Sequence, residues 1–243
     1  MMKPASLLRS LLVLTVAPLL TLLVSIITLI WTVLFRRPAD EAQVLGRYWG
    51  KCICALSGVT VKIEGLENLT PDRTYIFAAN HQSQFDILTL QGYLEFNFRW
   101  LAKKELFQVP IWGAAMKRAG YIPVDRSRGR QALKSLDEAA KRIADGTSVI
   151  IFPEGTRSRD GKLHPFKSGG MVLAIKAGVE IVPVAISGTY EILPKGRLML
   201  HPGNVLIKIG MPIPTADYRT NQKHELALRL QKDVAGLLDR SGP

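Results

Sequence analysis

Cysteine is scarce in this sequence, with Cys52 and Cys54 as the two present among 243 residues. They form a single Cys-x-Cys without a second cysteine pair or a nearby histidine, which argues against a zinc site. No other group of His, Cys, Asp and Glu falls at the spacing of metal ligands, and internal repeats and low-complexity linkers are absent. We therefore expect free thiols in a reducing compartment and no metal or other cofactor.

Acidic residues are also in deficit, with 20 Asp and Glu against 32 Lys and Arg and a formal net charge of +12. This excess predicts an anionic partner, which nucleic acid, anionic lipid and a phosphorylated substrate would all satisfy. The sequence has no helix-turn-helix, zinc-finger or aromatic RNA-binding motif, so we expect no nucleic acid. The length fits one domain plus an appendage.

An apolar run at residues 11–35 carries no charge over 25 residues. A helix of that length reaches about 37 Å, more than the roughly 30 Å hydrocarbon core of a bilayer. The run is too long for a signal peptide, and no small-residue cleavage pattern precedes Arg36. It predicts a membrane anchor over residues 1–37. Pro18 leaves two forms open, a single spanning helix and a hairpin of shorter helices that dips into one leaflet.

Basic residues beyond this run favour a cytosolic location for the remainder of the chain, on the inner, or cytoplasmic, membrane. They are Arg36, Arg37, Arg47 and Lys51. A one-leaflet hairpin would leave both ends on that same side. Residues 38–58 are expected to form an amphipathic connector, although Gly46 and Gly50 weaken the helix pattern there. Residues 59–243 would then form the main domain.

Strand and helix patterns alternate along this main domain. Strands are expected at residues 59–63, 75–79, 99–101, 121–124, 148–152, 181–186, 198–200 and 205–209. Helices are expected directly after residue 81, at 110–119, from 127 to 146, near 170–177, and in a last segment with Leu226, Leu230, Val234 and Leu237. Such alternation predicts an α/β fold with a mixed β-sheet flanked by helices.

His81 and Asp86 stand five residues apart, directly after the apolar run Tyr75–Ala79. A histidine at the carboxyl end of a buried strand can hold its imidazole rigidly with one ring nitrogen free. A carboxylate about one turn into the next helix can bind the other nitrogen, fix the tautomer and stabilise the imidazolium. A helix cap and a solvated first-turn acid would give the same spacing. The pair is a candidate general base with its orienting acid.

A second polar segment, residues 152–158, follows another apolar run 71 residues downstream of His81. Its Arg157 lies in a Gly-Thr loop, where backbone N–H groups can also point at an anion. Arg126 lies just beyond a further strand end. Two such guanidiniums can hold a phosphate by charge-assisted hydrogen bonds.

Two roles stay open for Glu154 in the same segment. It can hold the loop by accepting backbone N–H groups, or it can orient Arg157 or a substrate hydroxyl. Residues 97–130 add a dense basic stretch, with eight Lys or Arg against two acids. This density favours an anion-binding surface near the two motifs.

Four blocks resemble, in order and spacing, those of the glycerolipid acyltransferases, and most closely the 1-acyl-sn-glycerol-3-phosphate acyltransferases. They are residues 80–86 (matching N-H-x-S-x-x-D), 120–126, 152–158 with 166–169, and 182–186. The resemblance covers roughly residues 60–210. The family's third block often has a second basic residue where this chain has Ser168, so Lys167 alone is carried over there.

The resemblance implies the family's fold, and an acyltransferase catalytic domain at residues 59–243. It implies transfer of a fatty acyl group from acyl-CoA or acyl-acyl carrier protein to the free sn-2 hydroxyl of lysophosphatidic acid, giving phosphatidic acid in phospholipid biosynthesis. His81 and Asp86 would be catalytic. Together with the charge placement, it implies substrate-binding roles for Asn80, Ser83, Lys103, Arg126, Glu154, Gly155, Thr156, Arg157, Lys167 and Pro183.

Other functions remain compatible with these residues. Within the enzyme class, the acceptor could be glycerol-3-phosphate or another lysolipid, including an amino-acid-containing one. A non-catalytic scaffold for anionic lipid would use the same basic surface without needing His81 and Asp86. Membrane lipid is an expected partner in every case, and the sequence does not indicate an oligomeric state.

Overall fold

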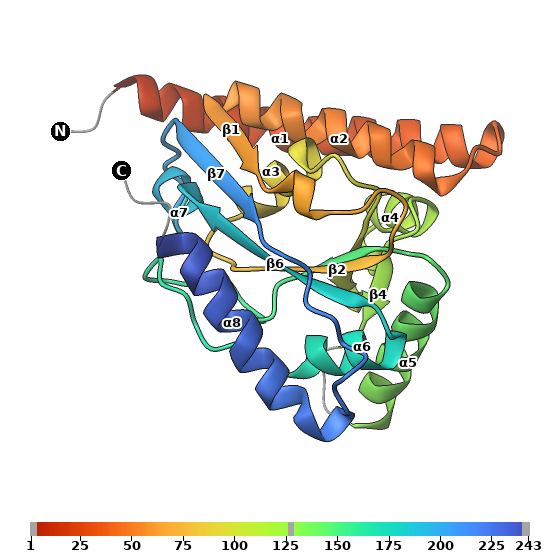
Figure 1. Cartoon of the computed structure of the whole chain (residues 1–243). Coiled ribbons are helices and arrows are strands. Elements are labelled where there is room, and N and C mark those ends of the chain that lie inside the picture. The colour runs from red at the N-terminus through yellow and green to blue at the C-terminus, as the bar shows by residue number, and fades with distance from the viewer. Residues whose placement is uncertain (1–3, 126–128, 240–243) are drawn as a thin grey trace.

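A mixed β-sheet forms the centre of the molecule (Figure 1). The computed structural model describes residues 4–125 and 129–239. Within them, seven strands pair in the order β1-β7-β6-β2-β5-β3-β4. The strands are β1 (Val59–Glu64), β2 (Tyr75–Ala79), β3 (Arg99–Lys103), β4 (Ile122–Val124), β5 (Val149–Ile151), β6 (Glu180–Ser187) and β7 (Gly203–Ile209). The predicted α/β class with a mixed sheet is confirmed.

Helices cover both faces of this sheet (Figure 1). They are α1 (Pro4–Leu29), α2 (Ala39–Leu56), α3 (Phe85–Tyr93), α4 (Trp112–Arg118), α5 (Arg130–Ala144), α6 (Gly169–Ala177), α7 (Thr189–Ile192) and α8 (Lys223–Asp239). On one face α2 packs against α3, and α1 packs against α2 and α4. On the other face α6 packs against α5 and α8. The result is a three-layer sandwich of helices, sheet and helices.

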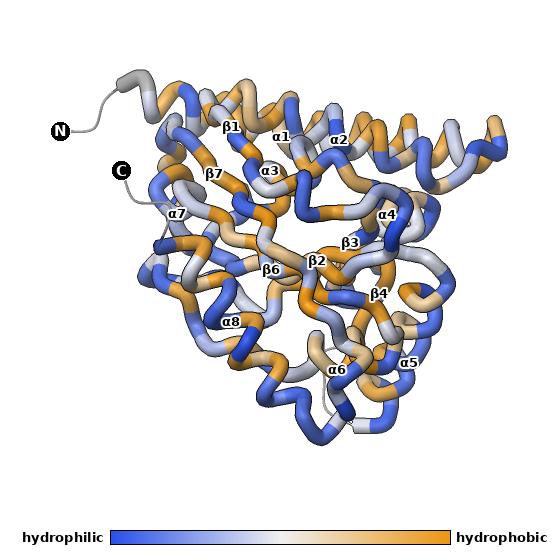
Figure 2. Tube along the Cα trace, viewed as in Figure 1, coloured by the Kyte–Doolittle hydropathy of each residue, from blue (hydrophilic) through white to orange (hydrophobic). Residues whose placement is uncertain are grey.

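β2 supplies side chains to the cores on both faces of the sheet. Tyr75, Phe77 and Ala79 belong to the core under α2 and α3, and Ile76 and Ala78 belong to the core under α5, α6 and α8. All five are buried. Figure 2 shows the central strands as largely hydrophobic. A strand that is apolar on both faces needs cover on both, which explains its central place in the sheet.

Five of these strands point the same way. β2 pairs in parallel with β5 and β6, β5 with β3, and β3 with β4. β7 runs antiparallel to β6, and β1 runs parallel to β7. The carboxyl ends of β6, β2 and β5 therefore meet at one edge of the sheet. Polar residues that come directly after these three strands lie together there, although they are far apart in the sequence.

α1 and the π-helical segment Ile30–Leu34 after it make one helix that is long and apolar enough to cross a membrane, over Ser6–Leu34. The helix continues through Pro18 without a break. It does not project from the molecule. It lies alongside α2 on the outside of the domain (Figure 1).

The two sides of α1 differ in chemistry. Ser10, Ser25 and Thr28 are buried against the protein, and the Ser10 hydroxyl accepts the backbone N–H of Leu200 at 2.8 Å. The outward side is apolar and uncovered, with Leu7, Leu8, Leu11, Leu12, Leu14, Leu19, Leu22, Leu23, Ile26 and Ile27 exposed. A helix with this division packs on a domain by one side and offers the other to an apolar phase.

The predicted connector helix is present as α2, and its glycines have a packing role. A Cβ atom on Gly50 would lie 2.7 Å from the Leu88 carbonyl oxygen and 2.8 Å from the Gly92 nitrogen, both in α3. A Cβ atom on Gly46 would lie 2.6 Å from Nε2 of Gln91, also in α3. The two glycines therefore let α2 approach α3 closely, which helix propensity alone does not reveal.

The strand predicted at residues 198–200 is wrong. The backbone N–H of Leu200 bonds to the Ser10 hydroxyl in α1, and the N–H of His201 bonds to the Ile192 carbonyl at 3.0 Å. These two backbone N–H groups bond to a side chain of α1 and to the end of α7, and not to a neighbouring strand, so no strand forms. The other predicted strands are present with slightly shifted ends. The predicted start of the helix at residue 127 lies outside the described residues.

Both cysteines are free thiols, with Cys52 exposed and Cys54 buried. Burial raises the pKa of the Cys54 thiol to about 12. Such a thiol stays protonated at neutral pH, which makes it a packing residue and not a nucleophile.

Candidate active site

His81 follows β2 directly, and its imidazole lies against the carboxylate of Asp86 in the first turn of α3. Nδ1 of His81 lies 2.7 Å from Oδ2 of Asp86. The His81 side chain is 13% exposed and the Asp86 side chain is 0% exposed. Nε2 of His81 has no hydrogen-bond partner among residues 4–125 and 129–239. An imidazole that donates from Nδ1 carries its lone pair on Nε2, so this nitrogen is free to accept a proton.

Three further donors hold the Asp86 carboxylate in one orientation. Oδ2 accepts the backbone N–H of Gln82 at 2.7 Å and that of Ser83 at 2.8 Å. Oδ1 accepts the hydroxyl of Thr189, a fully buried residue at the start of α7. The acid therefore cannot turn away from His81 without losing several hydrogen bonds. This is the geometry of a base with its orienting acid.

The sequence interpretation did not include Thr189. It lies 103 residues from Asp86 and reaches it because β6 and β2 are neighbours. Gly188 before it has φ of +91°, and a Cβ atom there would lie 2.1 Å from the Asn204 carbonyl oxygen. A Ser-Gly-Thr sequence at a strand end was the available signal, because small polar residues at the carboxyl edge of a parallel sheet often reach a site.

The ring and the backbone of His81 are also fixed. The imidazole stacks on the Phe152 ring, with centroids 3.9 Å apart and planes 12° apart. The His81 N–H donates to Oε1 of Glu154 at 2.7 Å, and the His81 carbonyl accepts the N–H of Ser158 at 2.7 Å. The segment after β5 therefore locks the residue on both sides, so the two sequence motifs form one unit.

Glu154 holds the loop in the structure, which is the first of the two roles that the sequence left open, and a contact with a substrate hydroxyl stays a prediction. Its carboxylate accepts the N–H of His81 and, at 3.3 Å, the N–H of His164. No bond joins it to Arg157 among the described residues. Burial raises the pKa of the Glu154 carboxyl, and the two backbone N–H groups act against that rise.

Asn80 and Ser83 are fully buried and serve as anchors in the structure. The Asn80 side chain donates to the Ile186 carbonyl at 2.9 Å and accepts the Ile186 N–H at 2.7 Å. The Ser83 hydroxyl donates to the Leu193 carbonyl at 2.7 Å. These bonds join the loop of His81 to β6 and to the segment after α7. A direct contact of either side chain with substrate stays a prediction.

Gly155, Thr156 and Arg157 form a turn that we call the 155–157 turn. Gly155 has φ of +78°, and a Cβ atom on it would lie 2.8 Å from Nζ of Lys167. The Lys167 ammonium therefore lies directly over the turn. The Arg157 guanidinium is half-buried and has no hydrogen-bond or ion-pair partner in the described part of the chain. The turn thus carries positive charge that no acid in the described residues pairs with, and Ser158 directly after it bonds to the His81 backbone.

Two of the remaining predicted site residues, Lys103 and Pro183, lie in strands β3 and β6. Lys103 ends β3, two strands from β2, and forms a 3.7 Å ion pair with Glu105 in which both side chains are largely exposed. Such a surface pair is weak and leaves the ammonium available. Pro183 is buried in β6, where its carbonyl accepts the N–H of Gly210 at 2.8 Å. Arg126 lies outside the described residues, so its role stays a prediction.

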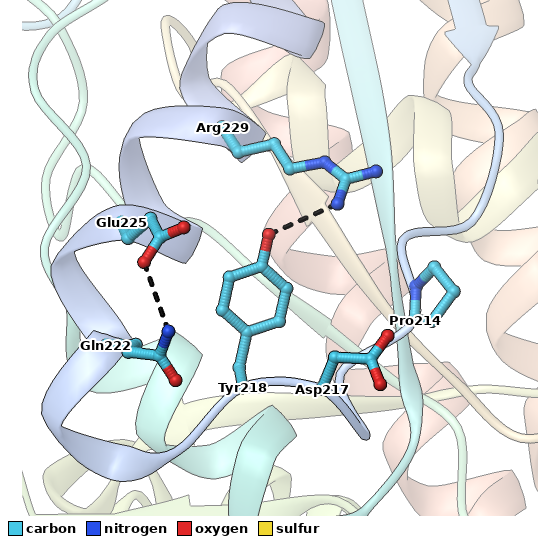
Figure 3. Close-up of a pocket in the computed structure, with 6 residues that line it drawn as sticks. All are labelled: Pro214, Asp217, Tyr218, Gln222, Glu225 and Arg229. Carbon is cyan, nitrogen blue, oxygen red and sulfur yellow. Dashed lines mark hydrogen bonds between the residues drawn. The ribbon is translucent and has the colours of Figure 1, made fainter.

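A shallow cavity of about 440 Å³ lies on another part of the molecule (Figure 3). It lies beyond Ile213, which pairs with Ile181 at the amino end of β6, on the edge opposite His81. Polar side chains in it bond to one another, as Arg229 does to Tyr218 at 3.1 Å. Its lining residues are Pro214, Asp217, Tyr218, Gln222, Glu225 and Arg229. None of the predicted site residues in the described part of the chain lines it.

Comparison with known proteins places this geometry in context. A family model described as Acyltransferase matches residues 60–187. A 1-acyl-sn-glycerol-3-phosphate acyltransferase from chloroplasts of Arabidopsis thaliana is 41% identical over 155 residues, which cover 63% of this chain and 43% of that protein. A 1-acyl-sn-glycerol-3-phosphate acyltransferase of Chlamydomonas reinhardtii is 37% identical over 182 residues, 74% of this chain and 54% of that protein. The chain spans about half the length of the curated relatives that it matches.

A solved structure matches over a larger share of both chains. The crystal structure of the 1-acyl-sn-glycerophosphate acyltransferase PlsC from Thermotoga maritima superposes with a TM-score of 0.72 and 30% sequence identity. The match covers 93% of this chain and 97% of that one. It therefore extends well beyond residues 60–187, which the family model matches.

Proposed function

This chain belongs to the acyltransferase family, and from that premise we propose that it transfers a fatty acyl group from acyl-CoA or acyl-acyl carrier protein to the sn-2 hydroxyl of lysophosphatidic acid, giving phosphatidic acid. The names of its relatives support this acceptor. The observation that carries the proposal is the free Nε2 of His81, oriented by Asp86, in a residue whose backbone carbonyl accepts the N–H of Ser158 directly after Arg157. A general base can deprotonate the hydroxyl of lysophosphatidic acid, and a nearby cationic site can bind its phosphate.

His81 acts as a general base in the proposed reaction. Nε2 removes the proton of the sn-2 hydroxyl while the oxygen attacks the thioester carbonyl carbon. The C–S bond then breaks, the acyl group remains on the glycerol oxygen as an ester, and the proton passes from the imidazolium to the departing thiolate. Asp86 holds the ring and stabilises its positive charge. Such a base contributes about 10² to 10⁴ in rate.

The acyl thioester is a co-substrate, and we propose no other cofactor. A thioester is already activated toward alcohols, so neither a covalent enzyme intermediate nor a metal is required. Binding both substrates in reacting geometry supplies the other large part of the rate.

The acceptor phosphate is proposed to bind at the 155–157 turn. The turn is tied to His81 by the bonds of Glu154 and Ser158 to the His81 backbone, at 2.7 Å each. An anion there has a fixed position relative to Nε2. Lys103 adds positive charge from β3, about 10 Å from β2 at the usual strand spacing. Arg126, which lies outside the described residues, is proposed to bind the same phosphate.

The proposed function predicts the outcome of a product analysis. Purified protein in detergent, given an acyl thioester and a panel of acceptors, should form phosphatidic acid from lysophosphatidic acid faster than it acylates glycerol-3-phosphate, monoacylglycerol or an amino-acid-containing lysolipid. The measurement is the initial rate per acceptor by mass spectrometry, with heat-inactivated protein as the control. Faster product formation from another acceptor would replace the proposed substrate, and absence of any transfer would support a lipid-binding scaffold.

We propose that α1 and α2 hold the domain on the cytosolic face of the cytoplasmic membrane. Their exposed apolar residues support membrane contact, and Arg36 and Arg37 in the turn between the helices support the cytosolic side. The long N-terminal helix packs on the domain over most of its length. Ser10 near the start of α1 is buried, and so is Thr32 in the helical segment after α1. A spanning α1 would pull charged parts of the domain into hydrocarbon, so we propose insertion of the helix pair into one leaflet.

If the outer side of α1 attaches the protein to the membrane, introducing charged residues on that side should release the protein from vesicles. Leu8, Leu19 and Leu23 are 71%, 66% and 53% exposed, so changing all three to glutamate should leave packing intact while removing about 1.5–3 kcal/mol of membrane burial each. When vesicles are sedimented, the triple variant should stay in the supernatant, whereas the unchanged protein should pellet with the vesicles even in 1 M salt or carbonate.

A matched control is Leu228→Glu in α8, where Leu228 is 70% exposed. That variant should remain in the pellet. Release of the unchanged protein by salt alone would show that basic residues provide the attachment and that the apolar side of α1 does not.

A further inference from the structure

Lys195 reaches the 155–157 turn from the segment after α7. Its Nζ donates to the Thr156 hydroxyl at 2.8 Å and to the Arg157 carbonyl at 3.1 Å. Lys195 is half-buried and has no acidic partner in the described part of the chain. It was not among the residues that the sequence motifs indicated, because it lies 39 residues beyond Thr156.

The backbone that carries Lys195 is joined to the catalytic loop. Pro194 forms a β-bridge with Ser83, and the Ser83 hydroxyl donates to the Leu193 carbonyl at 2.7 Å. Ser83 also binds Asp86 through its N–H. The Lys195 ammonium is therefore held relative to His81 by the same residue that orients the acid.

Three cationic side chains belong to this turn or contact it, and no acid in the described part of the chain pairs with them. They are the side chains of Arg157, Lys167 and Lys195. Glu154 accepts two backbone N–H groups. Asp160 accepts the Ser158 hydroxyl at 2.8 Å and contacts the His164 ring at 2.9 Å. These two carboxylates of the loop are thus used inside it, and the positive charge of Arg157, Lys167 and Lys195 favours binding of an anion.

We propose that Lys195, the Thr156 hydroxyl and Arg157 together bind the dianion of a phosphate monoester and so select it over a phosphodiester. Because the Thr156 oxygen accepts from Lys195, its own proton is available to donate to a phosphate oxygen. A monoester carries close to two negative charges at neutral pH and three terminal oxygens. A phosphodiester headgroup has one negative charge and two terminal oxygens, so it can make only two of the three contacts.

This inference rests on the proposed function and specifies which lysolipids the same site accepts. It predicts that lysophosphatidic acid is preferred over its phosphomethyl ester, which has the same glycerol and chain but a single charge. Lys195→Met should lower kcat/KM for lysophosphatidic acid on the order of tenfold and for the methyl ester about two- to threefold. Lys195→Gln should behave like Lys195→Met although it can still bond to Thr156. Lys195→Arg should recover part of the loss, since it restores the charge.

The test measures kcat/KM for both acceptors at saturating donor, KM for the donor, and the melting temperature of each variant. Arg197→Gln is the matched control, since Arg197 is an exposed cation two residues further along. It should leave the ratio of the two acceptors unchanged. If Arg197→Gln lowered kcat/KM for lysophosphatidic acid as much as Lys195→Met does, the effect would be general electrostatic attraction, and the specific contact of Lys195 would be overturned.

Three other results would also overturn the assignment. Unchanged activity in Lys195→Gln would reduce Lys195 to a loop tether, and so would equal losses on both acceptors. A higher donor KM with an unchanged acceptor ratio would assign Lys195 to the phosphates of the acyl donor. If the wild-type protein synthesises phosphatidic acid normally, any of these results refutes this inference but leaves the proposed function intact. If the wild-type protein synthesises no phosphatidic acid, the proposed function itself is refuted.

Discussion

His81→Ala is expected to lower kcat by about 10²- to 10⁴-fold, because the proton of the attacking hydroxyl then has no positioned acceptor. The protein should stay folded. The ring contributes a stacking contact with Phe152, worth about 0.5–1.5 kcal/mol. It also gives one hydrogen bond to Asp86, which keeps its three other donors in the variant. Turnover and melting temperature should be measured on the same preparation, so that lost chemistry is separated from lost structure.

Asp86→Asn should produce a loss of similar size by a different route. The amide oxygen can replace Oδ2, which faces His81 and the N–H groups of Gln82 and Ser83. The amide NH₂ then replaces Oδ1 and can donate to the Thr189 hydroxyl. The local structure is kept while the negative charge that stabilises the imidazolium is lost.

If His81 and Asp86 act as one unit, the double variant should be hardly slower than His81→Ala. Thr189→Val is the milder member of the series, since it removes one hydrogen bond to Asp86 and leaves the acid charged. It should slow turnover in the presence of His81 and have little effect in its absence. Gln84→Ala serves as the control, since Gln84 is exposed in the same loop. Near wild-type turnover in His81→Ala would remove the base from the mechanism.

The strand order shows why the sequence predicted the core of the site. His81 and Glu154 each follow a short apolar run, and β2 and β5 are parallel neighbours. Residues that come after such runs meet at one sheet edge, so two local patterns were enough to bring them together. The same reasoning predicted Arg157 at this edge.

Thr189 and Lys195 could not be found in this way. Their contacts with Asp86 and Thr156 depend on how the segment after β6 folds back over the loop of His81. That fold is set by bonds between residues over 100 positions apart, such as Ser83 with Leu193. Local periodicity carries no information on such bonds. The wrong strand at residues 198–200 has the same cause, because the partner of Leu200 is Ser10 in α1.

The membrane helices and the catalytic pair share one rigid contact. α2 packs on α3 through Gly50, which lies against Leu88 and Gly92. Asp86 lies in the first turn of α3. The close approach leaves no room for a side chain, so the apolar side of the helix pair holds a fixed orientation relative to His81. In the proposed function, this contact would present the attacking hydroxyl of a membrane lipid from one direction.

Arg157→Ala is expected to lower kcat/KM for lysophosphatidic acid by roughly 10- to 150-fold, which corresponds to one charge-assisted contact of about 1.5–3 kcal/mol. Activity on monoacylglycerol, which has the hydroxyl but no phosphate, should fall much less because its transition state never made that contact. Arg157→Lys should recover part of the loss, since an ammonium keeps the charge but lacks the bidentate fork.

The neighbouring Arg159 provides the matched control for this series. Its side chain is exposed, and its backbone carbonyl accepts the Tyr190 hydroxyl at 3.0 Å. Arg159→Ala removes the same charge from the same loop and should leave the ratio of the two acceptors within about twofold of wild type. The measurement is kcat/KM for each acceptor at fixed donor concentration. Equal proportional losses on both acceptors in Arg157→Ala would mean that Arg157 supports the loop or the acyl donor, and the phosphate would have to be assigned to other residues.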